Sequence, residues 1–371
     1  MLYVAVDQHA KQLTVSVRDE AGDVVLRRQV STEWERVRRF WEEIRDRAAD
    51  QGGYVVILEV CGFNDWLIAL LIELQCSRIV LVQANERAST KTDRRDANRL
   101  GELLWVSRGR IASGQRVPGL KRIVIPSKVD AESRQLTSMR QRIVVQRTKC
   151  INRIRHLLLK YNIAQECPTK GIQTIKATKW LRELLLPEID RLELDQCLAQ
   201  WALIEIQRKL LDQRIASRQA DDPQAQLLAT LPGASAFSSL ALSCRIGDAS
   251  RFHSPKSLSH FWGLTPRCRN SGASTDRLGS ITKEGSKMAR FILGQLVLHV
   301  LKKDRWMREW YRQVKNRRGS KIARVAVMRR LTVVIWNMLT HQEPYRSGGP
   351  EVVRQTRKSV PTPEASPALS P

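Results

Sequence analysis

The sequence predicts an α/β fold over its first hundred residues, followed by a mainly α-helical remainder. Short apolar or alternating segments, each bounded by turn residues, predict strands before residue 85, with helical segments between the later ones. Beyond residue 127, apolar residues recur at helical spacing through residues 128–161. The chain has 371 residues, which is enough for two or three domains with cores of their own.

The amino-terminal elements follow in the order β-β-β-α-β-α-β-α. The first three strands form a predicted antiparallel meander, because Glu20–Asp23 is a turn signal between two of them. Thr32 and Glu35 have the spacing of a capping box, which opens the first helix. Strands that alternate with helices late in the run predict a sheet that becomes parallel after its hairpins. The predicted strands span 2–6, 13–18, 24–30, 54–60 and 78–82, and the helices 32–49, 64–75 and 93–106.

Five segments make up the predicted domain organisation. An α/β domain over 1–115 is followed by a linker over 116–126, which is interrupted by Gly and Pro. A helical coiled-coil region over 127–222 contains a long helix and a partner helix within 188–220. A mainly helical domain over 223–345 has apolar helices around 287–302 and 322–340, and the polar, Pro-rich tail over 346–371 is expected to be disordered.

The charge of the chain predicts a polyanionic partner, of which nucleic acid is the commonest. The formal net charge is +26 and the pI is about 10.5. The surplus is concentrated: residues 127–165 carry nine Lys or Arg against two acids, and residues 287–330 carry fourteen against two. The arginines of the long helix could form a solvated face, or they could contact phosphate or a partner, and composition leaves these interpretations open. No apolar run is long enough to cross a bilayer and no signal peptide is present, so we expect a cytoplasmic protein without a membrane partner.

Seven cysteines are scattered singly through the chain, and no two have C-x-x-C spacing. This pattern predicts neither a structural zinc site nor a disulfide framework.

Four acidic residues lie at the ends of predicted strands or at the start of a predicted helix. Asp7 lies just past the first strand, Glu59 near the end of the buried fourth strand, and Asp93 and Asp96 open the last helix, three residues apart on one face. Carboxylates at the edge of apolar strands are costly to bury unless they are paired or bind a cation. The order of elements with these four acids is the ribonuclease-H-like pattern, which predicts a site for Mg²⁺ or Mn²⁺.

Each acid also has a structural explanation. Asp7 could cap a turn, Glu59 could pair with an arginine, and Asp93 and Asp96 could complement a helix amino terminus. His9 would share a face with Asp7 on a strand, but we expect it to be non-catalytic because magnesium prefers oxygen ligands.

The chain resembles the transposases of the insertion-sequence family one-ten, the DEDD recombinases guided by a bridge RNA. The resemblance rests on VAVDQHA, LEVCG, KTDRRDA, the NRI segment at 152–154, LPG at 231–233 and GLTPRCRNSG…LGSITKEG. It implies a ribonuclease-H-like (RuvC-like) domain in which Asp7, Glu59, Asp93 and Asp96 are catalytic metal ligands. A C-terminal transposase domain would carry a catalytic serine.

The family's serine lies in a Ser-Ser-Gly segment after GL-x-P, and this chain has Asn270-Ser271-Gly272. Ser271 is therefore the best match, with Ser274 and Ser280 as alternatives and Ser286 remote. The implied reaction is attack by Ser271 on a DNA phosphodiester, which gives a phosphoserine link. The cations expected to steady the phosphate are Arg267, Arg269, Arg277 and Lys283.

The resemblance further implies DNA as target and donor, a guide RNA, and a homo-oligomer (a tetramer held by the coiled coil) acting at the nucleoid. Two other functions fit the same residues. A RuvC-type junction endonuclease would use water in place of the serine, and a non-catalytic nucleic-acid-binding protein would use the four acids only for structure.

Overall fold

The computed structural model describes residues 1–83, 93–268 and 278–347, without the side chains of residues 93–96, 268 and 278. The chain forms two compact units, residues 1–125 and 126–371. No helix within the described ranges is long and apolar enough to cross a membrane. The six cysteines whose side chains are described are all free thiols.

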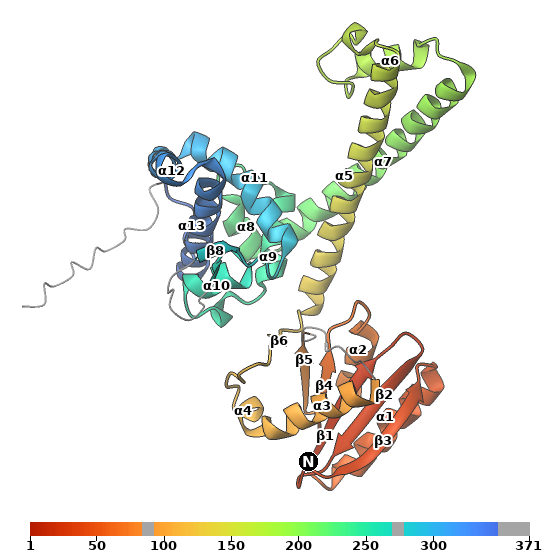
Figure 1. Cartoon of the computed structure of the whole chain (residues 1–371), viewed down its shortest axis with the longest axis vertical. Helices are drawn as coiled ribbons and strands as arrows, with labels where there is room; N and C mark the ends of the chain where they lie inside the picture. The colour runs from red at the N-terminus through yellow and green to blue at the C-terminus, as the bar shows by residue number, and fades with distance from the viewer. Residues whose placement is uncertain (84–92, 269–277, 348–371) are drawn as a thin grey trace, which may run out of the picture. The chain divides into compact units, whose positions relative to one another are not determined.

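The first unit is built on a six-stranded mixed sheet with the order β3-β2-β1-β4-β5-β6 (Figure 1). Pairs β1–β4 and β4–β5 are parallel, and the other neighbours are antiparallel. The sheet thus becomes parallel after its hairpins, as the sequence predicted. The strands are β1 (Leu2–Gln8), β2 (Gln12–Arg18), β3 (Val24–Ser31), β4 (Tyr54–Glu59), β5 (Arg78–Val82) and β6 (Arg122–Ile123).

Helices cover both faces of this sheet, which explains why β1 and β4 are apolar almost throughout. Helices α1 (Trp34–Ala49) and α2 (Asp65–Glu73) pack on one face, where the even-numbered residues of β1 and β4 form a core with Trp41. Helices α3 (Asp93–Val106) and α4 (Arg108–Ala112) lie on the other face, against Tyr3, Ala5, Val55 and Ile57. Residues on one strand therefore alternate between the two cores.

Three predictions for this unit were wrong in detail. Strand β1 continues to Gln8, so Asp7 lies within the strand and not past its end. The capping box at Thr32 does not form, because the Thr32 hydroxyl donates to the Ala10 carbonyl (3.0 Å) and the helix begins only at Trp34. The predicted linker contains strand β6, which pairs with the edge of β5.

The second unit is mainly helical. Its helices are α5 (Lys128–Lys160), α6 (Ile175–Glu183), α7 (Glu188–Ala220), α8 (Pro223–Ala229), α9 (Ala236–Ile246), α10 (Pro255–Phe261), α11 (Lys287–Lys303), α12 (Arg305–Arg318) and α13 (Ser320–His341). Short 3₁₀ turns lie at Ala164–Glu166 and Ala249–Arg251, and β7 (Pro266–Cys268) pairs with β8 (Leu278–Ile281) as a hairpin. The sequence predicted α5, α11 and α13, and placed the partner of α5 where α7 lies.

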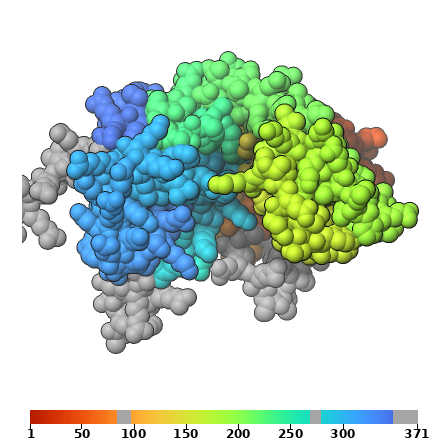
Figure 2. All heavy atoms as spheres, turned by 90° about the horizontal axis from the view of Figure 1, so that it is seen from above, coloured from red at the N-terminus to blue at the C-terminus, as the bar shows by residue number. Residues whose placement is uncertain are grey.

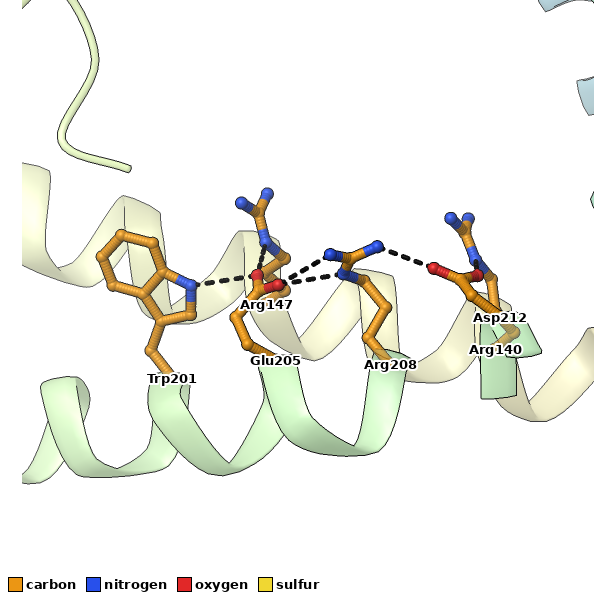
Figure 3. Close-up of polar contacts among 6 residues, drawn as sticks. All are labelled: Arg140, Arg147, Trp201, Glu205, Arg208 and Asp212. Carbon is orange, nitrogen blue, oxygen red and sulfur yellow. Dashed lines mark hydrogen bonds and ion pairs between the residues drawn. The ribbon is translucent and has the colours of Figure 1, made fainter. Parts of the chain in front are cut away.

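Helices α5 and α7 run antiparallel, and a chain of charged side chains joins them (Figure 3). Asp212 accepts from Arg140 (3.0 Å) and Arg208 (2.7 Å), and Arg208 also contacts Glu205 (2.9 Å). Glu205 in turn pairs with Arg147. Further along, Arg153 pairs with Glu193 and Lys160 with Asp190. Four cations of α5 therefore pair with its partner helix α7, which is one of the uses that the sequence left open.

Glu205 is the central acid of this network, and its titration gives a test. Burial raises its pKa, but hydrogen bonds from Arg147, Arg208 and Trp201 outweigh burial and hold the pKa below its usual value. Because the folded pKa is depressed, the network stabilises the helix pair above the unfolded carboxyl pKa of about 4.3 and loses this effect as the pH falls through the folded value. We expect Glu205→Gln to lower the free energy of unfolding by about 1–2 kcal/mol at pH 7. In that variant, the free energy of unfolding should also fall less steeply as the pH is lowered toward 3.

Urea denaturation between pH 3 and 7, followed by far-ultraviolet circular dichroism, measures both effects. Glu183→Gln is the control, because Glu183 is exposed and lies 3.9 Å from Lys179. That variant should stay within about 0.5 kcal/mol of the parent protein. If the free energy of unfolding of Glu205→Gln falls as steeply at low pH as that of the parent protein, the network does not govern the pH dependence of stability.

Candidate active site

Asp7 and Glu59 stand at the carboxyl ends of two adjacent parallel strands. Strands β1 and β4 pair up to Val6 and Leu58, and the two acids follow one residue later on each strand. Ala5 and Ile57, two residues earlier, belong to the core on the α3 side of the sheet. Because side chains alternate along a strand, Asp7 and Glu59 share that side. The structure therefore brings these two predicted residues together.

Helix α3 runs antiparallel to β1 across this face. The Ser16 hydroxyl, which lies opposite Ala5, donates to Asn98 (3.0 Å), whereas Trp105 donates to the Glu20 carbonyl beyond the far end of β2. The amino end of α3 therefore points toward Asp7. Near this amino end, Ala97 and Asn98 line a pocket together with Thr14, the residue opposite Asp7 on β2.

A buried pair of amides fixes the two strand ends against each other. Asn64, which is 4% exposed, donates to the Gln8 side chain (2.9 Å) and to the Glu59 carbonyl (3.0 Å), and accepts from the Cys61 amide (2.6 Å). Gln8 donates to the Phe63 carbonyl (3.0 Å). These bonds connect the residue after Asp7 to the backbone of Glu59, so they set the spacing of the two acids. The sequence analysis missed this pair, since isolated amides carry no spacing signal.

Asn64→Ala tests this clamp. It removes the Asn64 partner of the Gln8 side-chain oxygen, the Glu59 carbonyl and the Cys61 N–H, which should cost about 2–4 kcal/mol. Hydrogen exchange of peptides from β1 and β4, together with urea denaturation, measures the loss. Asn98→Ala removes the bond from Ser16, the one bond of this side chain to the described residues, and should cost about 1 kcal/mol. Unchanged exchange at β4 in Asn64→Ala would contradict the role given to Asn64.

The other predicted acids are described only in part. Asp93 and Asp96 lie in the first turn of α3, as predicted, but their side chains fall outside the described residues. Asp7 is 18% exposed and its carboxylate contacts the His9 imidazole at 3.1 Å. Among the side chains that are described, no group of three or more His, Cys, Asp or Glu is placed to hold a metal ion.

The predicted serine segment lies between β7 and β8. Ser271, Ser274, Arg269 and Arg277 fall outside the described residues, and Ser280 lies in β8. Ser286 is the amino-terminal cap of α11 and accepts from the Ala289 amide (3.1 Å). Of the predicted phosphate contacts, Arg267 is exposed and donates to the Thr282 carbonyl (3.1 Å), and exposed Lys283 has a left-handed backbone with φ of 58°.

Two glycines and one arginine close the base of this hairpin. A Cβ on Gly263 would lie 2.2 Å from the Glu284 carbonyl oxygen, and one on Gly285 would lie 1.9 Å from that of Phe261. Only glycine fits at either position, so the two backbones can approach. The Arg290 guanidinium donates to the carbonyls of Trp262 (3.1 Å) and Glu284 (2.7 Å) and thereby joins both sides.

Comparison with known proteins gives two family models that match separate stretches of the chain. Residues 4–163 match the family model of the DEDD transposases of IS110, and residues 225–312 match that of the IS116/IS110/IS902 transposase family. The chain belongs to the IS110 family of transposases. The family expected from the sequence motifs is thereby confirmed, and the mixed α/β sheet agrees with the ribonuclease-H-like fold that the DEDD model implies.

Relatives of this IS110-family chain include mobile-element and inversion proteins. The transposase for insertion sequence element IS1111A of Coxiella burnetii is 27% identical over 314 residues, which are 79% of each chain. A probable family 20 transposase of Pseudomonas aeruginosa is 23% identical over 89% of this chain and 94% of its own length. The pilin gene-inverting protein of Moraxella bovis is 28% identical over 33% of this chain and 38% of its own.

Proposed function

We propose that this transposase cuts and rejoins DNA strands with Asp7, Glu59, Asp93 and Asp96 as ligands of divalent metal ions. The carrying observation is that Asp7 and Glu59 stand at the same end of the sheet, on the face that α3 covers, and that α3 begins toward that end. With Asp93 and Asp96 they would form a set of four carboxylates, which are the hard oxygen donors that Mg²⁺ or Mn²⁺ prefers.

The surroundings of Asp7 fit such an ion. Thr14 pairs with Asp7 across β1 and β2, and its hydroxyl is buried without a hydrogen-bond partner among the described residues. A buried hydroxyl of this kind is suited to bind ion-bound water. When bound, the metal ions would neutralise charge on the phosphate and on the leaving oxygen. The chain's own part is to hold the four carboxylates at fixed spacing, which the amides of Gln8 and Asn64 support.

The proposed nucleophile is Ser271, carried by the β7–β8 hairpin. Its Oγ would form a bond to phosphorus while the bond from phosphorus to the 3′ oxygen breaks, and the hydroxyl proton would pass to that oxygen. The product is a phosphoserine link and a free 3′-hydroxyl, which can attack another such link without hydrolysis. Arg267 and Lys283 flank the loop, and we assign them with Arg269 and Arg277 to the phosphate.

A guide RNA and a homo-oligomer complete the proposal, with the protein acting on nucleoid DNA in the cytoplasm. Helix α7 supports the oligomer, since it carries a second apolar stripe besides the one that packs on α5. The stripe has two groups with spacings of three and four residues, and it consists of Ile189 and Leu192, then Leu203, Ile206 and Leu210, which are 54–72% exposed.

The direct test of the function is a strand-exchange assay with purified protein, Mg²⁺ and two DNA duplexes that carry the element's ends and a target, with the cognate RNA. Joined recombinant strands are the expected product. Cleaved strands with free 5′-phosphates and no joining would overturn the proposal in favour of a junction endonuclease, and unchanged DNA in favour of a binding protein.

A further inference from the structure

Helices α12 and α13 meet at a corner that is rich in exposed cations. Gly319, with φ of 82°, separates the two helices. No acid occurs between Glu309 and Glu343. Within that interval, seven cationic side chains are exposed: Arg312, Lys315, Arg317, Arg318, Lys321, Arg324 and Arg329. We call these seven residues the corner cations. Figure 2 shows α11 and α12, in lighter blue, at the surface of the C-terminal unit.

The corner cations differ from the other basic stretch of the chain in how they are used. On α5, four cations are paired with acids of α7. No corner cation forms an ion pair with a residue that the structure describes. Concentrated like charge repels itself and destabilises the unit unless a counter-charge arrives. The corner therefore offers positive charge, unpaired among the described residues, to an external polyanion, which the four paired cations of α5 do not.

The corner is also part of the packed unit and not a loose arm. Met307 of α12 and Ala323 and Val327 of α13 are fully buried. The Arg330 guanidinium lies 4.0 Å from the Trp306 ring centroid and 4.9 Å from that of Trp310, which joins α13 to α12. The residues from 315 to 324 lie within about 8 Å of Gly319 along the two helix axes. Five cations thus converge on one rigid feature.

We infer that the corner cations bind the phosphate backbone of a nucleic-acid duplex. This inference rests on the proposed function only in taking nucleic acid as the partner. The aromatic rings of the region favour a duplex over a single strand, because most of them are engaged within the unit. Trp310, Tyr311 and Trp336 pack on its core, and Trp306, which is 38% exposed, has the Arg330 guanidinium over its ring. Single-strand binding surfaces offer free aromatic faces for the bases, and a surface of cations alone contacts backbone.

The test is the salt dependence of binding by Lys315→Gln/Arg318→Gln/Lys321→Gln/Arg324→Gln in the full chain. The matched control is Arg28→Gln/Arg36→Gln/Arg39→Gln/Arg45→Gln, which removes the same charge from exposed arginines that are each paired with an acid. Fluorescence anisotropy without divalent metal gives Kd for a 30-base-pair DNA duplex, an RNA duplex of equal length and a 30-nucleotide deoxythymidine strand.

We expect the slope of log Kd against log salt to fall by about two to four for at least one duplex, at about 0.9 for each lost phosphate contact, and by less than one in the control. If the slope falls for only one of the two duplexes, that duplex is the one that binds to the corner cations. Equal slopes in the corner variant and the control, or a loss confined to the single strand, would overturn the inference. Asp7→Asn should keep the full slope and lose strand exchange, so failure of the proposed function would be seen separately.

Discussion

Replacing Asp7 by Asn, or Glu59 by Gln, is expected to lower strand exchange at least about a hundredfold and to leave nucleic-acid binding intact. Each change keeps the size of the side chain and removes one negative charge at the carboxyl end of β1 or β4. Loss of a metal ligand removes the charge stabilisation that the reacting phosphate needs, which is among the largest single contributions to such catalysis. The rate of recombinant product formation, at saturating DNA and Mg²⁺, measures the effect.

Glu20→Gln is the matched control for these two variants. Glu20 lies on the same sheet but beyond the opposite end of β2, where it is exposed beside the amino terminus of the chain. The rate of that variant should stay within about twofold of the parent rate. If Asp7→Asn and Glu59→Gln behave like Glu20→Gln, the acids are structural and the proposed chemistry is wrong.

The second large effect concerns the nucleophile. Ser271→Ala should abolish the covalent protein–DNA adduct, because no other atom of the side chain can form the phosphoester. Binding to DNA and RNA should be unchanged, since a loop hydroxyl contributes little to a contact made by cations. Denaturing gel electrophoresis of end-labelled DNA after incubation with Mg²⁺ detects the adduct directly.

Ser274→Ala and Ser280→Ala are the controls for Ser271, and both should retain the adduct. An adduct that disappears only in one of these controls would move the nucleophile to that position. Cleavage without any adduct in the parent protein would show that water is the nucleophile, as in a junction endonuclease.

Most of the α/β unit could be predicted because its strands obey simple periodicities. The two-sided burial of β1 and β4 gives near-continuous apolar runs, so an Asp or Glu at their ends is conspicuous. The sequence likewise placed a helix from about Asp93, which is where the described part of α3 begins. Strand boundaries were less certain: β1 extends two residues past its apolar run because Asp7 and Gln8 pair with β2.

The elements that were missed are short or strongly polar. Strand β6 has two residues and is held by its pairing with β5. Helix α12 is amphipathic, but it buries only Met307 and its other residues are mostly cations and polar groups, so it was not recognised as a separate helix. Pairing between α5 and α7 depends on which residues face each other over more than fifty positions, as for Arg147 and Glu205. Long-range contacts of this kind are set by the fold and leave no local signal.

The most direct test of the account is the binding of Mn²⁺ to the purified full chain, measured by isothermal titration calorimetry together with electron paramagnetic resonance. The account predicts a saturable site that is lost or weakened at least about tenfold in each of Asp7→Asn, Glu59→Gln, Asp93→Asn and Asp96→Asn, and kept in Glu20→Gln. Equal Mn²⁺ binding by the parent protein and all four variants would contradict it.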